Sequence, residues 1–248
     1  MCMKGNMKII KVKNYNEMSQ QAYDYLHDYI EQDGHPVVGL ATGSTPEGLY
    51  QLMIEHHRKR SFSCRELITF NLDEYIGLQQ SDKNSYHYYM KHKLFDHVDI
   101  RPEQAHLPNG LAKNLEEECR EYDRKISRAG GLGLQILGIG HNGHIGFNEP
   151  GTPFGTTTHI ATLTASTRQA NVRFFNDIDE VPQQAICMGI RKIMESHEIL
   201  LMVSGQEKAG ALRRLLEGPV NEQFPASILL THPHVTLIAD EAALGEEN

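Results

Sequence analysis

Residues 37–47 read VVGLATGSTPE, an apolar run followed by a glycine turn and by a proline that suits the first turn of a helix. Continuous apolar runs of this length are typical of strands that are covered on both faces. A buried strand that leads through a tight turn into a helix is half of a βαβ unit. This stretch therefore predicts an α/β fold with a mostly parallel sheet.

The same alternation of strand-like and helix-like segments continues along the chain. Further strands are expected at 67–72 (LITFNL), 134–139 (LQILGI), 160–164 (IATLT), 199–203 (ILLMV) and 235–239 (VTLIA), with a weaker one at 8–12. Helices are expected at 18–30, from 46 onward, and at 84–96, 115–126, 166–176 and 206–217. Ligands of such sheets bind outside the carboxyl ends of the strands, where the strand order reverses, so the site is expected there.

Length, composition and charge indicate a single globular domain and argue against a secreted, membrane or nucleic-acid-binding protein. The 248 residues are 40% hydrophobic and 23% charged, which suits one domain over residues 1–248. The start of the chain carries no secretory signal pattern and no run reaches the length of a membrane helix, so we expect a cytoplasmic protein with no membrane partner. Four dispersed cysteines read as reduced thiols. A net charge of −8 without a Lys/Arg run argues against nucleic-acid binding.

Two turns that follow strands have the shape of an anion site. In 42–47 (TGSTPE), Gly43 permits a tight turn, and Ser44 or Thr45 can either cap the next helix or face a phosphate. The alternative is an S-x-x-E capping box that only stabilises the helix. In 203–208 (VSGQEK), Lys208 lies in a first helical turn, where a bound anion would offset its conflict with the helix dipole. The alternative is a solvated surface lysine.

Two adjacent carboxylates follow the strand at 67–72. If the pleat continues through Asp73 and Glu74, they point to opposite faces, so only one can face a site. We favour Asp73 as that residue. The alternative is a pair of solvated acids on an exposed turn.

The densest segment is 138–150, GIGHNGHIGFNEP. It contains G-x-G-x-x-G, but the turn-forming residues that follow do not open a helix, so the segment is not a dinucleotide fingerprint. Four glycines in nine positions also argue against a helix that would bring His141 and His144 together as metal ligands. We predict no metal and no cofactor. A loop that folds back could instead bring His144 next to Glu149, so that the imidazole acts as a general acid/base and the carboxylate orients it. The alternative is a loop histidine that a nearby acid merely caps, without a catalytic role.

Other basic residues receive simpler interpretations. Arg168 and Arg173 lie about 140° apart around a predicted helix, so one is expected to bind a ligand and the other to be solvated. His232 and His234 are expected on the surface.

The segments TGSTP (42–46), LDEY (72–75), GIGHNGHIGFNEP (138–150), TRQANVRFF (167–175) and SGQEKA (204–209) stand in the order of a known family. In these motifs, and from about Met7 to the C-terminus, the sequence resembles the glucosamine-6-phosphate deaminases of the glucosamine/galactosamine-6-phosphate isomerase family. The resemblance implies a Rossmann-like three-layer α/β/α sandwich. It also implies an enzyme of amino-sugar catabolism, a hydrolase that isomerises and deaminates glucosamine 6-phosphate to fructose 6-phosphate and ammonia.

The resemblance also implies roles for individual residues. Asp73 is the base for enolisation, and His144 serves ring opening together with Glu149 and Asn142. Many members carry aspartate at the position of Asn142, and an asparagine cannot titrate. The phosphate is held by Lys208, Arg173 and the loop around Gly43, Ser44 and Thr45.

Two rival functions share this fold. One is a 6-phosphogluconolactonase-like hydrolase, whose loop resembles GxDGHxxSLFP rather than HNGHIGFNEP. The other is a non-catalytic sugar-phosphate sensor, which would lack the acid/base groups that are present here.

The polar segment 150–185 is expected to contain a mobile lid. Larger members of the family that are allosterically activated have basic residues after FNEP and a longer C-terminal tail. Here that stretch reads TTTHIATLT (156–164) and the chain ends soon after its last strand. We therefore expect no activator site, in a monomer or a small homo-oligomer.

Overall fold

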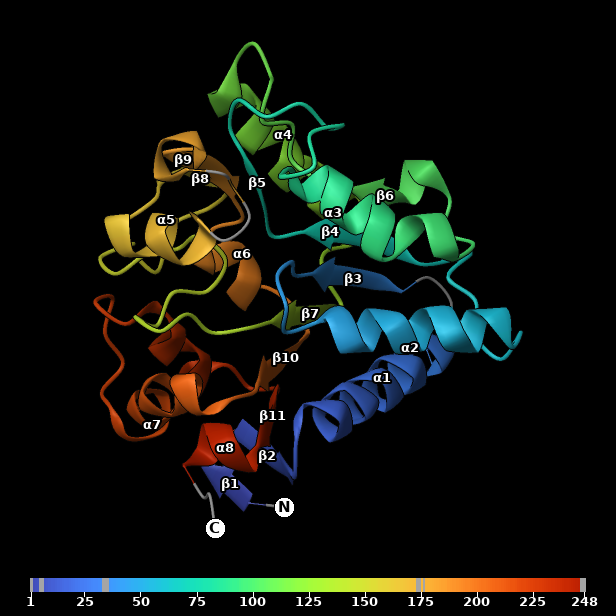
Figure 1. The fold of residues 1–248 in the computed structure, drawn as a ribbon, viewed down its shortest axis with the longest axis vertical. Coiled ribbons are helices and arrows are strands. Elements are labelled where there is room, and N and C mark those ends of the chain that lie inside the picture. Colours follow the sequence, from blue (N-terminus) through green and yellow to red (C-terminus); the bar gives the residue numbers. More distant parts are fainter. Residues whose placement is uncertain (1, 5–6, 33–35, 173–174, 176, 246–248) are drawn as a thin grey trace.

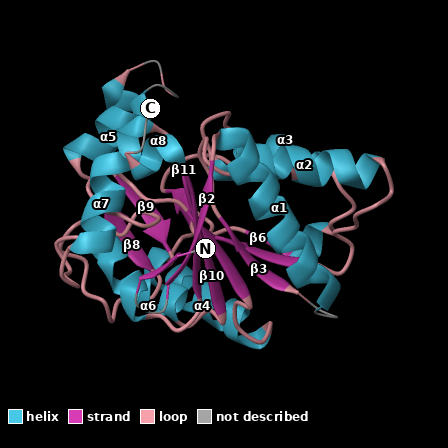
Figure 2. Cartoon of the chain, turned by 90° about the horizontal axis from the view of Figure 1, so that it is seen from below, coloured by secondary structure: helices cyan, strands magenta, loops and turns pink. Residues whose placement is uncertain are grey.

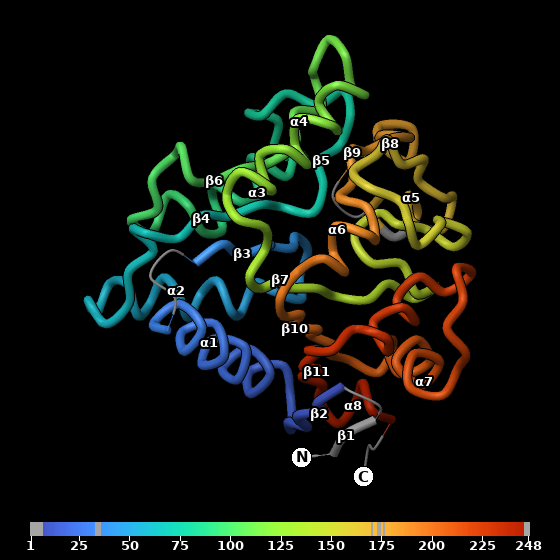
Figure 3. Tube along the Cα trace, turned by 180° about the vertical axis from the view of Figure 1, so that it is seen from behind, coloured from blue at the N-terminus to red at the C-terminus, as the bar shows by residue number. Residues whose placement is uncertain are grey.

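The computed structural model describes residues 2–4, 7–32, 36–172, 175 and 177–245. Its core is an eight-stranded sheet whose strands are neighbours in the order β1 (Cys2–Lys4), β2 (Met7–Val12), β11 (Val235–Asp240), β10 (Glu198–Val203), β7 (Leu134–Leu137), β3 (Val37–Leu40), β4 (Ile68–Asn71) and β6 (Ala105–His106). All neighbours pair in parallel except β1, which is antiparallel to β2. Figure 3 shows this order running from β6 at one edge to β1 at the other. The expected mostly parallel sheet is confirmed.

Helices cover both faces of this sheet (Figures 1 and 2). One face packs against α1 (Tyr15–Gln32), α2 (Glu47–Arg58) and α3 (Tyr86–Lys93). The other packs against α4 (Leu115–Arg128), α6 (Ile190–Met194), α7 (Ala209–Glu217) and α8 (Glu241–Leu244). The central strands β3, β7, β10 and β11 are almost fully buried, because the side chains on both of their faces are mostly apolar. The three-layer α/β/α sandwich is thus confirmed.

The strand order reverses between β3 and β7. From β3 the chain adds β4 and β6 on one side, and from β7 it adds β10 and β11 on the other. The loops that leave the carboxyl ends of β3 and β7 therefore diverge and leave a crevice between them.

A second, three-stranded sheet is antiparallel and consists of β5 (Asp73–Tyr75), β9 (Gln184–Cys187) and β8 (His159–Thr162). The expectation that 160–164 joins the parallel sheet is wrong, because β8 pairs only within this small sheet. β8 is only partly buried, and Ala161 is its buried residue. Ala161 belongs to the same apolar cluster as Tyr75 and Phe147.

Several helix boundaries differ from those expected. Within the helix predicted over 166–176, the structure has α5 (Ala165–Asn171), and positions 173, 174 and 176 lie outside the described residues. The helix predicted over 84–96 ends at Lys93, before a 3₁₀ turn at Phe95–His97. The one predicted over 206–217 begins with a 3₁₀ turn at Gln206–Lys208. Other 3₁₀ segments are Pro102–Gln104, Ile178–Glu180 and Pro225–Thr231.

Two local interpretations are also corrected. The S-x-x-E capping box is absent, since Pro46 precedes α2 without a side-chain cap and Glu47 pairs with Lys93 at 3.0 Å. His232 is buried rather than on the surface, because its Nε2 lies 2.9 Å from the carbonyl oxygen of Ser196. His234 is exposed, as expected. No helix among the described residues is long and apolar enough to cross a membrane.

Candidate active site

A cavity of about 880 Å³ opens at the carboxyl ends of the parallel strands, in the crevice between β3 and β7. Loops after β3, β5, β7 and β10 line it, as do residues of α3 and α5. Six of the predicted site residues lie on its wall, namely Gly43, Ser44, Thr45, Asp73, His144 and Lys208. The tertiary structure therefore brings together motifs that are up to 165 positions apart in the sequence.

Asp73 is the first residue of β5 and is 5% exposed. The pleat does continue through it, so Asp73 faces the cavity while Glu74 points away. Burial raises the pKa of Asp73 to about 8, and the nearby negative charge of Glu74 acts in the same direction. The interpretation of the two acids as solvated is wrong.

Glu74 anchors α3 instead of facing the cavity. Its Oε1 accepts hydrogen bonds from the N–H groups of Tyr75 and Tyr86, at 2.8 and 2.9 Å. Its Oε2 accepts from the N–H of His87 at 2.9 Å and lies 2.7 Å from the Nδ1 of the same residue. A buried carboxylate at a helix N-terminus satisfies N–H groups that have no helical partner.

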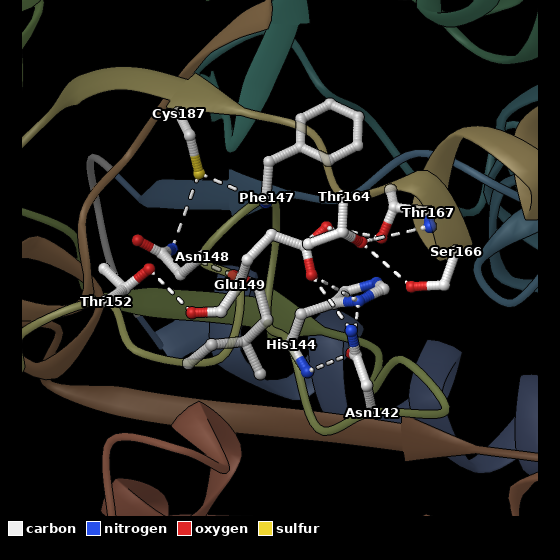
Figure 4. A network of polar contacts seen from close by, with 11 residues as sticks. Asn142, His144, Phe147, Asn148, Glu149, Thr152, Thr164, Ser166, Thr167 and Cys187 are labelled. Atoms are coloured by element: carbon white, nitrogen blue, oxygen red, sulfur yellow. Dashed lines mark hydrogen bonds and ion pairs between the residues drawn. The ribbon is translucent and has the colours of Figure 1, made fainter. Parts of the chain in front are cut away.

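His144, Asn142 and Glu149 form the expected group, but with the asparagine between the other two (Figure 4). Asn142 Nδ2 donates to Glu149 Oε2 at 2.9 Å, and Asn142 Oδ1 lies 2.7 Å from His144 Nδ1. The direct distance between His144 Nδ1 and Glu149 Oε2 is 3.8 Å. The imidazole lies over Gly140, where an added Cβ would come within 2.2 Å of the ring, so the glycine leaves room for it.

This arrangement fixes the tautomer of His144. A carboxylate only accepts hydrogen bonds, so the amide of Asn142 must turn its NH₂ toward Glu149 and its oxygen toward the imidazole. The proton therefore sits on His144 Nδ1, which leaves Nε2 as the basic nitrogen. Burial lowers the pKa of His144 below its ordinary 6.5, Lys208 and His141 act in the same direction, and Glu149 opposes them. The ring is accordingly neutral at pH 7.

Glu149 is held from its other side by two hydroxyl groups. Its Oε1 accepts hydrogen bonds from Thr167 and, at 3.2 Å, from Thr164 (Figure 4). Thr167 belongs to α5 and also lines the cavity. Neither Glu149 nor Asn142 lies on the cavity wall, and the chain of contacts from Glu149 through Asn142 reaches the wall at His144.

The predicted basic residues have different outcomes. Lys208 lies on the cavity wall, in the loop that follows β10. Arg168 does not line the cavity and is half-buried rather than solvated, since its guanidinium donates to the carbonyl oxygens of Ile178 and Val181. Arg173 lies outside the described residues.

Several cavity residues received no individual role from the sequence. They include Tyr15, Thr42, Tyr75, Tyr86, Tyr89 and Thr167. Most come from helices rather than from strand ends, and a tyrosine on an amphipathic helix has the pattern of an ordinary core residue. Among the described residues, no group of three or more His, Cys, Asp or Glu side chains could hold a metal ion.

Comparisons with known proteins agree with this architecture. The sequence model of the family described as "Glucosamine-6-phosphate isomerases/6-phosphogluconolactonase" matches residues 12–238. A glucosamine-6-phosphate deaminase of Oceanobacillus iheyensis is 59% identical over 238 residues, which cover 96% of this chain and 95% of the relative. Glucosamine-6-phosphate deaminase 1 of Bacillus subtilis is 48% identical over 237 residues, covering 96% and 98%.

Solved structures show the same relationship. A structure described as a monomeric glucosamine-6-phosphate deaminase superposes with a TM-score of 0.95 at 48% identity, covering 97% of this chain and all of the other. The 6-phosphogluconolactonase of Thermotoga maritima, at 18% identity and a TM-score of 0.74, covers 94% of this chain and 99% of that one and shares the fold. The chain therefore belongs to the family of glucosamine-6-phosphate isomerases and 6-phosphogluconolactonases.

Proposed function

We propose that the protein is a glucosamine-6-phosphate deaminase, which converts glucosamine 6-phosphate and water to fructose 6-phosphate and ammonia in amino-sugar catabolism. The observation that carries this proposal is the placement of Asp73 and His144 on the wall of one cavity, together with the turn at Gly43–Thr45 and Lys208. Relatives that are 48–59% identical over nearly the whole chain bear that name.

The first chemical step is the opening of the sugar ring. It requires a proton to leave the hydroxyl on C1 and another to reach the ring oxygen. His144 Nε2 is the group for this exchange, because Asn142 occupies Nδ1 and the neutral ring can accept a proton. Asn142 transfers no proton itself, and its role is to hold the tautomer and to connect His144 to Glu149.

The second step moves a proton within the open chain. Asp73 takes the proton from C2 and returns it at C1, while a proton of the substrate ammonium group passes to O1. The resulting iminium at C2 is then hydrolysed by water to a ketone and ammonia. Because water is consumed, we class the reaction as a hydrolysis as well as an isomerisation. The phosphate, held by Gly43, Ser44, Thr45 and Lys208, positions the reacting carbons, and Arg173 is proposed as a further phosphate ligand.

The direct test incubates the purified protein with glucosamine 6-phosphate and follows ammonia and fructose 6-phosphate together. Equimolar products are expected, and 6-phosphogluconolactone serves as the control substrate. Hydrolysis of the lactone without reaction of the amino sugar would assign a lactonase instead. No reaction with either compound would leave a sugar-phosphate binding protein.

We further propose that the chain is one domain that acts as a monomer or small homo-oligomer without an activator site. A similar solved structure is described as monomeric. Rates are therefore expected to rise hyperbolically with substrate, and an N-acetylated sugar phosphate should leave the curve unchanged. A sigmoidal curve that this compound makes hyperbolic would contradict the proposal.

Segment 150–185 is proposed to contain a lid, because it is rich in polar residues and its helix α5 places Thr167 and Asn171 on the cavity wall. Thr167 of α5 binds Glu149, so ordering of this helix and orientation of the acid/base group are coupled. We expect substrate to slow amide hydrogen exchange in α5 several-fold, measured on Asp73→Asn so that the complex does not turn over. The amides of β10 serve as the internal control. Unchanged exchange in α5 would refute the lid.

The pH dependence of the reaction follows from the raised pKa of Asp73. A base must be ionised, and burial raises the pKa of this carboxyl to about 8. We expect kcat/KM of the free enzyme to rise with pH, to be half-maximal near pH 8 and to level off about one unit above that, after correction for titration of the substrate amine measured separately. The lowered pKa of His144 places its titration below 6.5, outside this limb. A profile that is flat from pH 6 to 9 would exclude Asp73 as the base.

A further inference from the structure

Tyrosines from three helices converge on the turn that follows β3. Tyr50 of α2 donates its hydroxyl hydrogen to the carbonyl oxygen of Ala41 at 2.5 Å, and Tyr89 of α3 donates to that of Gly43 at 2.6 Å. Tyr15, the first residue of α1, donates to that of Ser44 at 2.9 Å. Three of the four carbonyl groups from Ala41 to Ser44 are thus held by tyrosine hydroxyls.

Two further contacts complete the set. The hydroxyl of Tyr15 accepts a hydrogen bond from the N–H of Gly48 at 2.8 Å, which fixes its own direction. The hydroxyl of Tyr86 hydrogen-bonds the side chain of Thr42. Four tyrosines therefore contact four successive residues of the turn.

These contacts determine where the N–H groups of the turn point. A trans peptide is planar, with its C=O and N–H directed oppositely, so holding the carbonyl of one residue orients the N–H of the next. The carbonyls of Gly43 and Ser44 are drawn toward the layer of α1, α2 and α3. The N–H groups of Ser44 and Thr45 are consequently turned the other way.

The N–H groups of Gly43, Ser44 and Thr45 make no hydrogen bond to any residue that the structure describes. The same three residues line the cavity. Gly43 has φ +89°, a conformation that favours glycine. Successive N–H groups without a protein acceptor, at the wall of a cavity, match the needs of a multivalent anion.

We propose that Tyr15, Tyr50 and Tyr89 are positioning residues, which hold the turn at 41–45 in the one conformation that presents its N–H groups to the substrate phosphate. This inference rests on the proposed function for its substrate, although its chemistry concerns only the phosphate. Each of these hydroxyls donates its one hydrogen to a carbonyl oxygen of the turn and has none left to donate to an anion. Their contribution is therefore to preorganise the anion site before binding.

The test replaces Tyr89 by phenylalanine, which removes one hydroxyl and keeps the ring. We expect KM for glucosamine 6-phosphate and the inhibition constant of inorganic phosphate to rise together by about 3–10-fold, with kcat within about twofold of the wild type. The combined variant Tyr15→Phe/Tyr89→Phe should show a larger rise in both constants. Direct titration with inorganic phosphate gives the same affinity without turnover.

The matched control is Tyr25→Phe. Its hydroxyl also makes a hydrogen bond, to Glu198 at 2.5 Å, but it does not line the cavity, so KM and phosphate affinity should not change. Tyr15→Phe is the second variant if Tyr89→Phe does not fold, as judged by circular dichroism. Wild-type phosphate affinity in a folded Tyr89→Phe or Tyr15→Phe protein would overturn the inference. A wild-type protein that binds phosphate in a Tyr89-dependent way, but does not deaminate the sugar, would overturn only the proposed function.

Discussion

Asp73→Asn is expected to lower kcat by about 10²–10⁴-fold while leaving substrate affinity near that of the wild type. Asparagine has almost the same shape as aspartate but cannot take the C2 proton. The measurement is the steady-state rate of ammonia release, together with equilibrium binding of glucosamine 6-phosphate. Turnover within tenfold of the wild type would exclude Asp73 as the base.

Asp73→Asn is expected to lower activity but to raise the stability of the fold, and stability therefore provides a second measurement. The folded-state pKa of Asp73 is raised to about 8 from an unfolded value near 4, so ionising the buried carboxyl destabilises the fold as pH rises through this range. Asp73→Asn removes that ionisation. Its melting temperature should therefore exceed that of the wild type by more at pH 9 than at pH 6. Asp28→Asn, at an exposed position of α1, is the control and should change neither activity nor this trend.

Lys208→Ala is expected to lower kcat/KM by about 30–1000-fold, which corresponds to a loss of about 2–4 kcal/mol of transition-state stabilisation. Binding energy from the remote phosphate orients the reacting carbons, so part of the loss should appear in kcat. Lys208→Met tests the charge while keeping most of the side-chain length, and it should be nearly as impaired. A near-native kcat/KM in either variant would refute the role of Lys208.

Lys208 also has a measurable influence on the acid/base group. Its positive charge helps to lower the pKa of His144, so either substitution should raise that pKa and move its titration to higher pH. The pH profile of kcat/KM and histidine resonances in NMR spectra both report this shift. Lys91→Ala, which removes an exposed lysine paired with Asp96, serves as the control.

The sequence predicted the central sheet because its strands are buried on both faces and so appear as continuous apolar runs. The strand at 37–41 and the turn at 42–46 were recognisable for that reason. β9 was not predicted and β8 was assigned to the wrong sheet, since both are short and β9 pairs with β8 and β5 rather than with the parallel strands. Periodicity indicates how much of a segment is buried, but it does not indicate which strand lies beside it.

Some features of the candidate site could likewise be predicted from the sequence, and others only from the structure. Local pattern was enough to single out Asp73, His144 and Glu149, because their chemistry and their positions after strands are visible in the chain itself. The insertion of Asn142 between His144 and Glu149 depends on how the glycine-rich loop folds back. The exact position of the Asn142 side chain depends on the three-dimensional path of this loop, which composition does not encode.

The sequence by itself determined the α/β class, the strand ends where chemistry-bearing residues gather, and the identity of the acid/base candidates, since these depend on residue type and near-neighbour spacing. Only the tertiary structure decided that Thr167 binds Glu149 and that tyrosines of α1, α2 and α3 hold the turn after β3. The physical reason is that hydrogen bonds between residues 9 to 46 positions apart are set by helix packing over the sheet, which no local pattern specifies.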